Sequence, residues 1–316
     1  MNNILSEDTI KDTNYMVQCE NLIKIYKSSD DIEVVALQGL DLNIEQGELM
    51  AIIGNSGSGK STLLNMIGCL DIPTAGKLIV DGKDLFKLSK KEIIEYKKQT
   101  VGFVWQNNAR NLIPYLTALE NVELALSISK AKNRREKALK YLDMVSMSHR
   151  KNNSLSQLSG GEQQRIAIAI ALANEPKILL ADEPTGSVDT KTSNLILDLF
   201  RKLNKELGLT IVIVTHDRQI SSKVDRVVAI RDGKTSSEFI RKISYAEELK
   251  DIEEGLQDQV DSKDTHIELA ILDKAGRLQI PSEYLEALNL KDKNKIKVEL
   301  EDEKIILCSP DKENAS

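Results

Sequence analysis

The sequence contains few residues of several kinds, and each shortage excludes a class of protein. Its three cysteines, Cys19, Cys69 and Cys308, lie far apart, so neither a disulfide framework nor a cysteine-rich zinc site is expected. No apolar run reaches the roughly 20 residues that a membrane-spanning helix needs. The polar residues 1–15 lack the basic-then-apolar order of a signal peptide. We therefore expect a soluble protein of a reducing compartment, with any attachment to a membrane made through a partner.

The sequence also lacks an excess of basic residues. Its formal net charge is −6, and the acidic residues are concentrated after residue 241. Proteins held on nucleic acid by phosphate contacts need a basic surface. Nucleic acid is therefore not the expected partner.

What is present divides the chain into three parts. Residues 1–241 alternate short β-branched segments with helical patterns, which is typical of an α/β domain with a parallel sheet. Strands are predicted at 48–54, 177–182, 210–216 and 226–233, and helices at 60–70, 163–173 and 191–207. The strands 177–182 and 210–216 are apolar on both faces, as in the centre of a parallel sheet.

An acidic segment and a small domain are expected after the α/β domain. Residues 242–262 carry two basic and seven acidic residues, which is typical of a linker or a short solvated helix. Residues 263–316 predict a hairpin around the turn DKAG (273–276), a short helix after Pro281, and a second hairpin around EDE (301–303).

A phosphate-binding loop is predicted between the first buried strand and the helix that follows it. The segment GNSGSGKST matches the pattern G-x-x-x-x-G-K-[ST], in which successive backbone N–H groups surround a phosphate. The lysine of this pattern contacts the β- and γ-phosphates, and the following hydroxyl binds Mg²⁺. A glycine-rich turn without a ligand is the alternative. The candidate nucleotide-binding residues are Gly54, Asn55, Ser56, Gly57, Ser58, Gly59, Lys60, Ser61 and Thr62.

Polar residues at the ends of three other strands are expected near this loop. Asp182 and Glu183 lie at the carboxyl edge of the sheet, where parallel sheets bind ligands. We expect Asp182 to act on Mg²⁺ and Glu183 to be the general base for the attacking water. His216 ends another strand and Gln106 follows residues 101–105. We expect both to contact the γ-phosphate or its water, although a structural histidine and a surface glutamine are the simpler alternatives.

A helix whose first turn contains two glycines needs an explanation. In LSGGEQQR (158–165), Ser159 and Glu162 stand three apart, as in a capping box. Gly160 and Gly161 each cost about 1 kcal/mol relative to alanine inside a helix. Their presence indicates that an anion approaches the backbone closely at this helix start.

Together these motifs resemble the ATP-binding subunits of ABC transporters, over residues 16–240. In order they are Walker A (54–62), the Q-loop residue Gln106, the signature (158–162), Walker B (178–183), the D-loop (187–189) and the switch His216. Residues 61–82, 116–126 and 179–192 are similar to the macrolide-export and lipoprotein-release branch. The resemblance implies an ABC-type P-loop NTPase fold with a helical subdomain.

The resemblance further implies an ATPase whose nucleotide site is shared between two subunits. Tyr26 would stack on adenine, unless it is an ordinary strand aromatic. The γ-phosphate bound by one subunit would be closed in by the signature of another, and Asp189 would link the two sites. The signature residues are Ser159, Gly160, Gly161 and Glu162, and the Mg²⁺ ligands would be Ser61, Gln106 and Asp182. ATP would then join two copies of the chain, or this chain and a related subunit.

The expected partner is a separate transmembrane permease, which would place the chain on the cytoplasmic face of the cell membrane. The resembled branch implies peptide, lipoprotein or drug export, or mechanical work on the cell envelope. Trp105 and residues 107–114 depart from the branch's usual pattern, in a region that meets the permease in the resembled proteins. A soluble ABC ATPase acting on DNA is the less favoured alternative, because no long insertion separates Walker A from the signature.

The segment 272–307 resembles the AbrB/SpoVT-type swapped-hairpin domain, in which two copies interlock. A domain this short cannot bury an adequate core alone. Lys274 and Arg277 match basic positions that bind DNA in that family, but the segment is acidic overall. We expect dimerisation or regulation, and the alternative is an ATP-dependent regulator that binds DNA through this domain.

Overall fold

The computed structural model describes two stretches of the chain, an N-terminal body and a smaller C-terminal part. The described residues are 14–27, 33–106, 111–241, 266–272, 276, 278, 280, 282–288, 290, 296–302 and 304–308. The expected linker, residues 242–262, lies outside the described residues, and so do Lys274 and Arg277.

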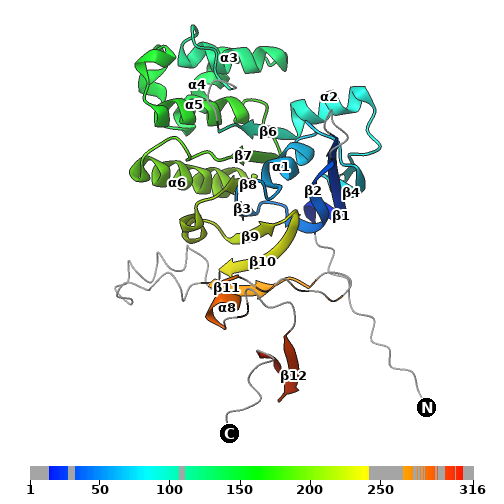
Figure 1. Ribbon diagram of the computed structural model, residues 1–316. Helices are drawn as coiled ribbons and strands as arrows, with labels where there is room; N and C mark the ends of the chain where they lie inside the picture. The colour runs from blue at the N-terminus through cyan, green and yellow to red at the C-terminus, as the bar shows by residue number, and fades with distance from the viewer. Residues whose placement is uncertain are drawn as a thin grey trace, which may run out of the picture.

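The body is built on a seven-stranded sheet with the strand order β11-β10-β9-β3-β8-β7-β6. Five neighbouring strands, from β9 to β6, run parallel, as the sequence predicts. The parallel strands are β3 (Leu49–Ile53), β6 (Val101–Val104), β7 (Ile178–Asp182), β8 (Thr210–Thr215) and β9 (Arg226–Arg231). Every residue of β3 and β8 is buried. Figure 1 shows the sheet rising from β10 to β6.

A second, antiparallel sheet lies beside the first. It has the order β2-β1-β4-β5, with β1 (Tyr15–Lys27), β2 (Glu33–Glu45), β4 (Ala75–Val80) and β5 (Lys83–Asp84). Helix α1 (Lys60–Ile67) shares one hydrophobic cluster with this sheet and with one face of the central strands. The phosphate loop that precedes α1 is therefore held between the two sheets.

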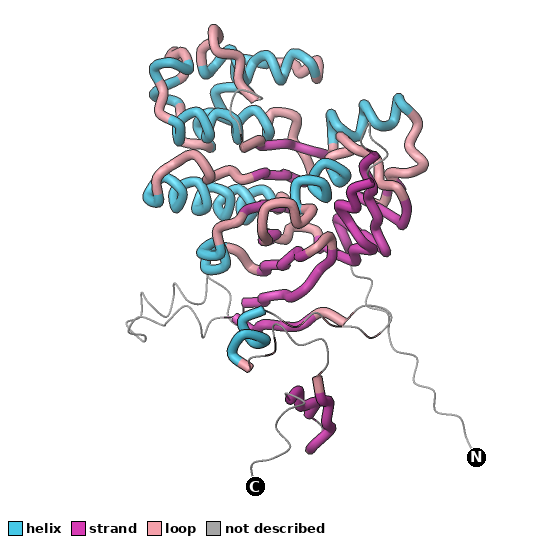
Figure 2. Tube along the Cα trace, in the orientation of Figure 1, coloured by secondary structure: helices cyan, strands magenta, loops and turns pink. Residues whose placement is uncertain are grey.

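The helices gather around the central sheet, and several form a subdomain beyond its β6 edge (Figure 2). This subdomain contains α3 (Ala118–Ile128), α4 (Arg134–Met144) and α5 (Gly160–Leu172), with the short turns Ser148–Arg150 and Leu155–Gln157 between α4 and α5. The remaining helices of the body are α2 (Lys90–Gln99), α6 (Thr190–Leu207) and the 3₁₀ turn Arg218–Lys223. The helices α3, α4, α5 and α6 contribute to the second hydrophobic cluster, on the other face of the sheet.

Alternate residues of each central strand explain why both faces are apolar. In β7, Leu179 and Ala181 belong to the cluster beneath α5 and α6, whereas Ile178 and Leu180 belong to the cluster around α1. A strand covered on both faces reads as a continuous apolar run. The prediction for 177–182 and 210–216 is confirmed.

The first strand of the C-terminal part has a partner that the sequence did not predict. β11 (His266–Ala270) pairs antiparallel with β10 (Lys234–Arg241) and so extends the central sheet. Of the hairpin expected around residues 273–276, the described residues show an isolated bridge between Leu272 and Leu278. An edge strand offers unpaired N–H and C=O groups to any nearby strand, and β10 supplies such an edge.

The rest of the C-terminal part follows the prediction. Helix α8 (Ser282–Ala287) comes after Pro281 in the sequence, and β12 (Lys297–Glu301) pairs antiparallel with β13 (Lys304–Cys308), with Glu301 opposite Lys304. In Figure 1 this hairpin stands apart from the two sheets of the body.

Candidate functional site

The phosphate loop lies where the sequence predicts it, between β3 and α1. Gly59 precedes α1 with φ +102°, a conformation that glycine adopts readily. A Cβ at this position would lie 2.5 Å from the backbone oxygen of Ala36. The loop therefore packs directly on β2, and a side chain at residue 59 would displace it.

The loop and three residues from other strand ends line one cavity of about 380 Å³. Lys60 Nζ donates hydrogen bonds to the backbone oxygens of Gly54 (2.8 Å) and Asn55 (3.0 Å), so its ammonium lies inside the loop. Burial lowers the pKa of Lys60, and the carboxylates of Glu183 and Asp182 oppose that shift. The lining residues are Ala36, Ser56, Gly57, Ser58, Gly59, Lys60, Ser61, Thr62, Gln106, Glu183 and His216.

The oxygen groups expected to bind Mg²⁺ are close together. Ser61 Oγ donates to Asp182 Oδ1 at 3.1 Å, which brings the end of β7 to the start of α1. Gln106 follows β6 and lines the same cavity. Among the described residues there is no cluster of three or more His, Cys, Asp or Glu side chains for a metal. One carboxylate with hydroxyl and amide oxygens fits Mg²⁺, which keeps several waters and is completed by substrate phosphates.

Glu183, which lines the cavity, is held in place by two hydrogen-bonding partners. Its backbone has φ +47°, which is uncommon for a residue other than glycine and is typical of functional sites. Thr215 Oγ1 donates to Glu183 Oε2 at 3.1 Å, and His216 Nδ1 lies 2.9 Å from Glu183 Oε1. The Glu183 side chain is 13% exposed and that of His216 is 71% exposed. A fixed carboxylate and an accessible imidazole therefore meet where a water could be activated.

The sequence did not reveal the role of Thr215. This residue ends β8 as part of a buried apolar strand, and its hydroxyl also accepts a hydrogen bond from the N–H of Asp217 at 3.1 Å. The feature of the sequence that could have indicated this role is a threonine directly before the histidine that ends the predicted strand.

Tyr26 lies at the end of β1, held by two side chains that the sequence did not reveal. Its hydroxyl donates to Asp71 Oδ2 at 2.6 Å, and Lys24 Nζ lies 4.7 Å from the ring centre. Lys24 also forms an ion pair with Asp71 at 2.6 Å. Burial, and then the hydrogen bond to Asp71, raise the pKa of the Tyr26 hydroxyl. A ring fixed in this way and 39% exposed can stack on a base.

The signature helix begins as predicted. Glu162 Oε2 accepts a hydrogen bond from the Ser159 N–H (2.8 Å), and Ser159 Oγ accepts one from the Glu162 N–H (3.3 Å), which is a capping box. The Ser159 backbone N–H is the main reason that the pKa of Glu162 is lowered. None of residues 158–162 is among the described residues that line the phosphate cavity. The structure therefore does not bring the signature to the phosphate loop of the same chain.

The two signature glycines have different surroundings. A Cβ on Gly161, which is buried, would lie 2.2 Å from Thr192 Cγ2. Gly160 is exposed, and its nearest neighbour would be Val188 Cγ1 at an ordinary 3.7 Å. Packing within the chain accounts for Gly161, while the close approach of an anion stays a prediction for Gly160.

Asp189 caps the helix that follows the D-loop. Its carboxylate accepts hydrogen bonds from the Thr192 N–H (3.0 Å) and the Thr192 hydroxyl (2.7 Å). Trp105, the departure noted before the Q-loop, stacks on Phe103 with ring centres 3.9 Å apart, and residues 107–110 lie outside the described part.

Comparisons with known proteins identify the family of the chain. The ABC transporter family model matches residues 37–186. An uncharacterised ABC transporter ATP-binding protein of Methanocaldococcus jannaschii, MJ0796, is 46% identical over 71% of this chain and 96% of its own length. The macrolide export ATP-binding/permease protein MacB of Rhodopirellula baltica is also 46% identical, over 72% of this chain and 34% of its own length.

Solved structures show the same fold. The dimeric post-hydrolysis structure of MJ0796 bound to ADP and Pi has a TM-score of 0.64 and 45% identity, over 71% of this chain and 97% of that one. The structure of cbiO1 from Clostridium perfringens, part of the ABC transporter complex cbiONQ, has a TM-score of 0.65 and 31% identity, over 71% and 88%. In the described part of the chain, no helix is long and apolar enough to span a membrane. The chain belongs to the ABC transporter ATP-binding proteins, and it is an ABC ATPase.

Proposed function

We propose that this chain is the ATP-hydrolysing subunit of an ABC transporter and that two ATPase subunits share each nucleotide. The supporting observation is the separation of the phosphate cavity from residues 158–162 of the same chain. Ser159 and Gly160 are exposed at the start of α5, so a second subunit can reach them. Anions bind at such helix starts. The MJ0796 structures are dimeric, which agrees with a site closed by a partner.

A residue can be assigned to each step of hydrolysis. Lys60 and the loop N–H groups would bind the β- and γ-phosphates, and Tyr26 would stack on the adenine. Glu183, oriented by Thr215 and His216, would accept the proton of the attacking water. Ser61, Asp182 and Gln106 would hold Mg²⁺, which when bound supplies positive charge at the phosphate oxygens.

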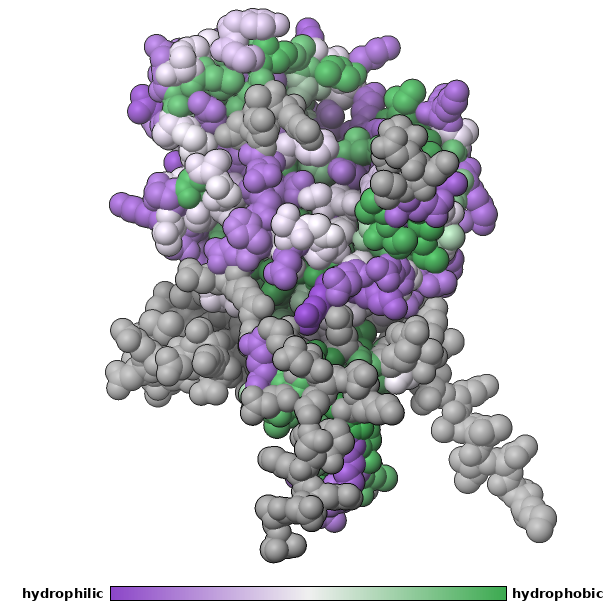
Figure 3. Space-filling model, in the orientation of Figure 1, coloured by the Kyte–Doolittle hydropathy of each residue, from purple (hydrophilic) through white to green (hydrophobic). Residues whose placement is uncertain are grey.

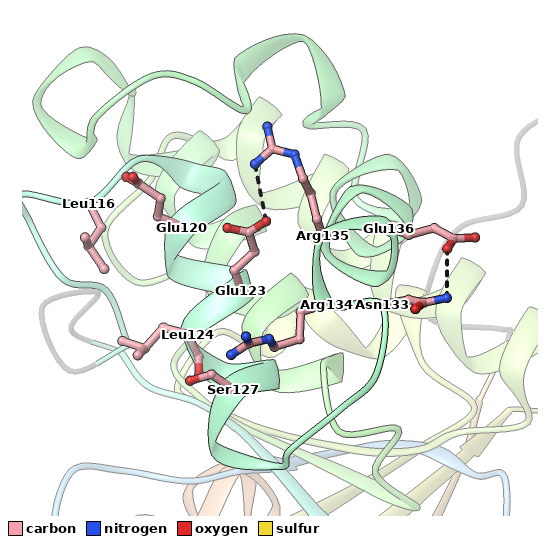
Figure 4. Close-up of a pocket in the computed structure, with 9 residues that line it drawn as sticks. All are labelled: Leu116, Glu120, Glu123, Leu124, Ser127, Asn133, Arg134, Arg135 and Glu136. Atoms are coloured by element: carbon pink, nitrogen blue, oxygen red, sulfur yellow. Dashed lines mark hydrogen bonds and ion pairs between the residues drawn. The ribbon is translucent and has the colours of Figure 1, made fainter.

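A groove between α3 and α4 is the proposed docking site for the permease. Its volume is about 880 Å³, and Figure 4 shows acidic and basic side chains along its walls, with Arg135 paired to Glu123 (3.5 Å) and Asn133 to Glu136 (3.3 Å). The exposed side chain of Leu124 adds apolar surface. Gln106 lines the phosphate cavity, and Leu116, ten residues later in the sequence, lines this groove. Nucleotide state and permease contact can therefore be linked. Peptide, lipoprotein or drug export, or mechanical work on the envelope, would follow from the permease engaged.

Co-purification from detergent-solubilised membranes tests the transporter assignment. We expect a multi-spanning protein to co-purify with the chain and to be lost from Leu124→Asp. Leu207→Asp, a change at an exposed leucine at the end of α6, is the matched control and should retain it. Recovery of a defined DNA segment in place of a membrane protein would instead support the regulator that binds DNA.

For the C-terminal part, we propose that it associates with a second copy of itself. The cross-strand register places Val298 opposite Leu307 and Leu300 opposite Ile305, on one face of the β12–β13 hairpin. Val298, Leu300 and Ile305 are 62%, 76% and 68% exposed, and Figure 3 shows hydrophobic surface at this hairpin. A two-stranded hairpin is at best marginally stable alone. Deleting residues 263–316 should turn a nucleotide-free dimer into a monomer by light scattering, and an unchanged mass would refute the proposal.

A further inference from the structure

The side chain of Thr192, on the first turn of α6, contacts two functional motifs at once. Its hydroxyl donates to Asp189 Oδ2 at 2.7 Å, and its N–H donates to Asp189 Oδ1 at 3.0 Å. Its methyl group lies against Gly161 of the signature helix, where a Cβ would come within 2.2 Å. Residues of the D-loop and the signature are thus joined through one short side chain.

The two contacts depend on a single torsion angle. Threonine is branched at Cβ, so one χ1 angle fixes the hydroxyl and the methyl together, and such side chains are stiff at χ1. Rotating the methyl away from Gly161 would break the hydroxyl's hydrogen bond to Asp189. Conversely, if the Asp189 carboxylate moved away, the χ1 angle of Thr192 would be free to change and the methyl could leave Gly161. Neither motif can shift without disturbing the other.

The packing around these residues supports such a link. Gly161 is buried and Thr192 is half-buried, whereas Ser159 and Gly160 are exposed. The nearest atoms to a Cβ on Gly160 would be Val188 Cγ1 and Ser187 O, at 3.7 and 3.8 Å. The start of α5 therefore lies near the D-loop at Gly160 and against Thr192 of α6 at Gly161, and the contact with Thr192 is the closer of the two.

We propose that Thr192 is a positioning residue that couples the signature of one subunit to the D-loop carboxylate of the same subunit. The proposal rests on the shared nucleotide site proposed above. A γ-phosphate that engages the start of α5 would press Gly161 against the Thr192 methyl and so hold Asp189 in place at the subunit interface. The glycine at position 161 is then required by Thr192, and not by the nucleotide.

Two variants can separate the role of the Thr192 hydroxyl from that of its methyl group. Thr192→Ser keeps the hydroxyl and removes the methyl, whereas Thr192→Val keeps the shape and removes the hydroxyl. We expect Thr192→Val to lower kcat about tenfold, a barrier change of about 1.4 kcal/mol, with KM for ATP changed less than about twofold. Thr190→Val, a change at an exposed threonine of the same turn, is the matched control and should match the parent chain.

The decisive experiment combines Gly161→Ala with Thr192→Ser in the full chain, with turnover as one readout and the ATP-dependent gain in mass as the other. The mass is measured with Leu300→Asp also present in every sample, because the C-terminal association proposed above would otherwise hold the nucleotide-free chain as a dimer. Gly161→Ala alone should impair both strongly, because its methyl would collide with that of Thr192. The turnover of the double variant should be at least about tenfold higher than that of Gly161→Ala alone. Only direct contact between the two positions explains such a recovery. Additive losses with no recovery would overturn the proposal.

The same samples distinguish this failure from failure of the shared site. If the parent chain forms an ATP-dependent dimer and the double variant shows no recovery, the Thr192 coupling is wrong and the shared site stands. If the parent chain forms no such dimer, the shared site itself is wrong, and with it the inference. Unchanged unfolding midpoints for Thr192→Val and Thr190→Val would show that the loss of kcat comes from positioning.

Discussion

The ATPase body and the C-terminal part both contain strands rich in apolar residues, but they differ in how far these side chains are buried. In the body, alternate residues of the central strands enter two large hydrophobic clusters, and side chains such as Ile52 and Leu180 are fully buried. In the C-terminal part, Leu290 is the one large hydrophobic side chain that is buried among the described residues. Its other large apolar residues, Val298 and Leu300 among them, are mostly exposed.

This difference indicates what stabilises each part of the chain. The body buries its apolar surface inside one chain. Its fold is therefore complete, whereas the shared nucleotide site that we propose would need a second subunit. The C-terminal part leaves apolar surface open, and exposed patches of this kind mark interaction sites. We therefore expect the two parts to need a partner for different reasons. The body would need one to complete its nucleotide site, and the C-terminal part would need one to bury its apolar surface.

The largest expected effect concerns chemistry in the body. Glu183→Gln keeps the shape of the side chain but cannot accept a proton, so turnover should fall about 10²- to 10⁴-fold. ATP should remain bound, and the dimer that it joins should persist. Turnover measures the first effect. Light scattering with ATP and Mg²⁺ measures the second, with Leu300→Asp also present so that only ATP joins the copies. A variant that stays monomeric under these conditions would contradict the shared site.

The second expected effect concerns the body's core. Phe200 on α6 is fully buried, and Phe200→Ala should lower the free energy of unfolding by about 3–5 kcal/mol. Leu207→Ala, at a half-exposed position of the same helix, should cost less than about 1 kcal/mol. Urea unfolding of both variants makes the comparison. Equal losses would show that the packing of α6 is not as described.

The third expected effect concerns the C-terminal face. Leu300→Asp places a charge on the exposed apolar side of β12 and should halve the mass of the nucleotide-free protein. Glu299→Asp, on the opposite face of the same strand, should leave the mass unchanged. Light scattering at one protein concentration decides, and a dimer that tolerates Leu300→Asp would show that another surface holds the copies together.

The smallest expected effect concerns the base of the nucleotide. Tyr26→Ala should raise KM for ATP about tenfold, because base–aromatic stacking contributes about 1–3 kcal/mol. Tyr26→Phe keeps the ring and loses the hydrogen bond to Asp71, so KM should rise less than about threefold. Equal effects of the two variants would mean that Tyr26 acts through its hydroxyl and not by stacking.

Sequence reasoning predicted the body well because its signals are local. The P-loop glycines, the Ser159–Glu162 capping box and the doubly apolar strands each specify a conformation over a few residues. Contacts between distant segments were not visible, which is why the hydrogen bond from Thr215 to Glu183 and the seating of Gly161 on Thr192 appear only in the structure. β11 was expected to form a hairpin with the residues that follow it. The bridge between Leu272 and Leu278 lies in that hairpin, but the pairing of β11 with β10 was not visible in the sequence, because an open sheet edge can pair with a distant segment.

Complementation between two inactive variants tests the shared site most directly. Lys60→Ala disables the phosphate loop and Ser159→Arg disables the signature, so each protein alone should be inactive. Random exchange makes about half of the dimers mixed, each with one complete site, so the mixture should recover about a quarter of the parent turnover. A mixture no more active than the sum of its two components would contradict the account.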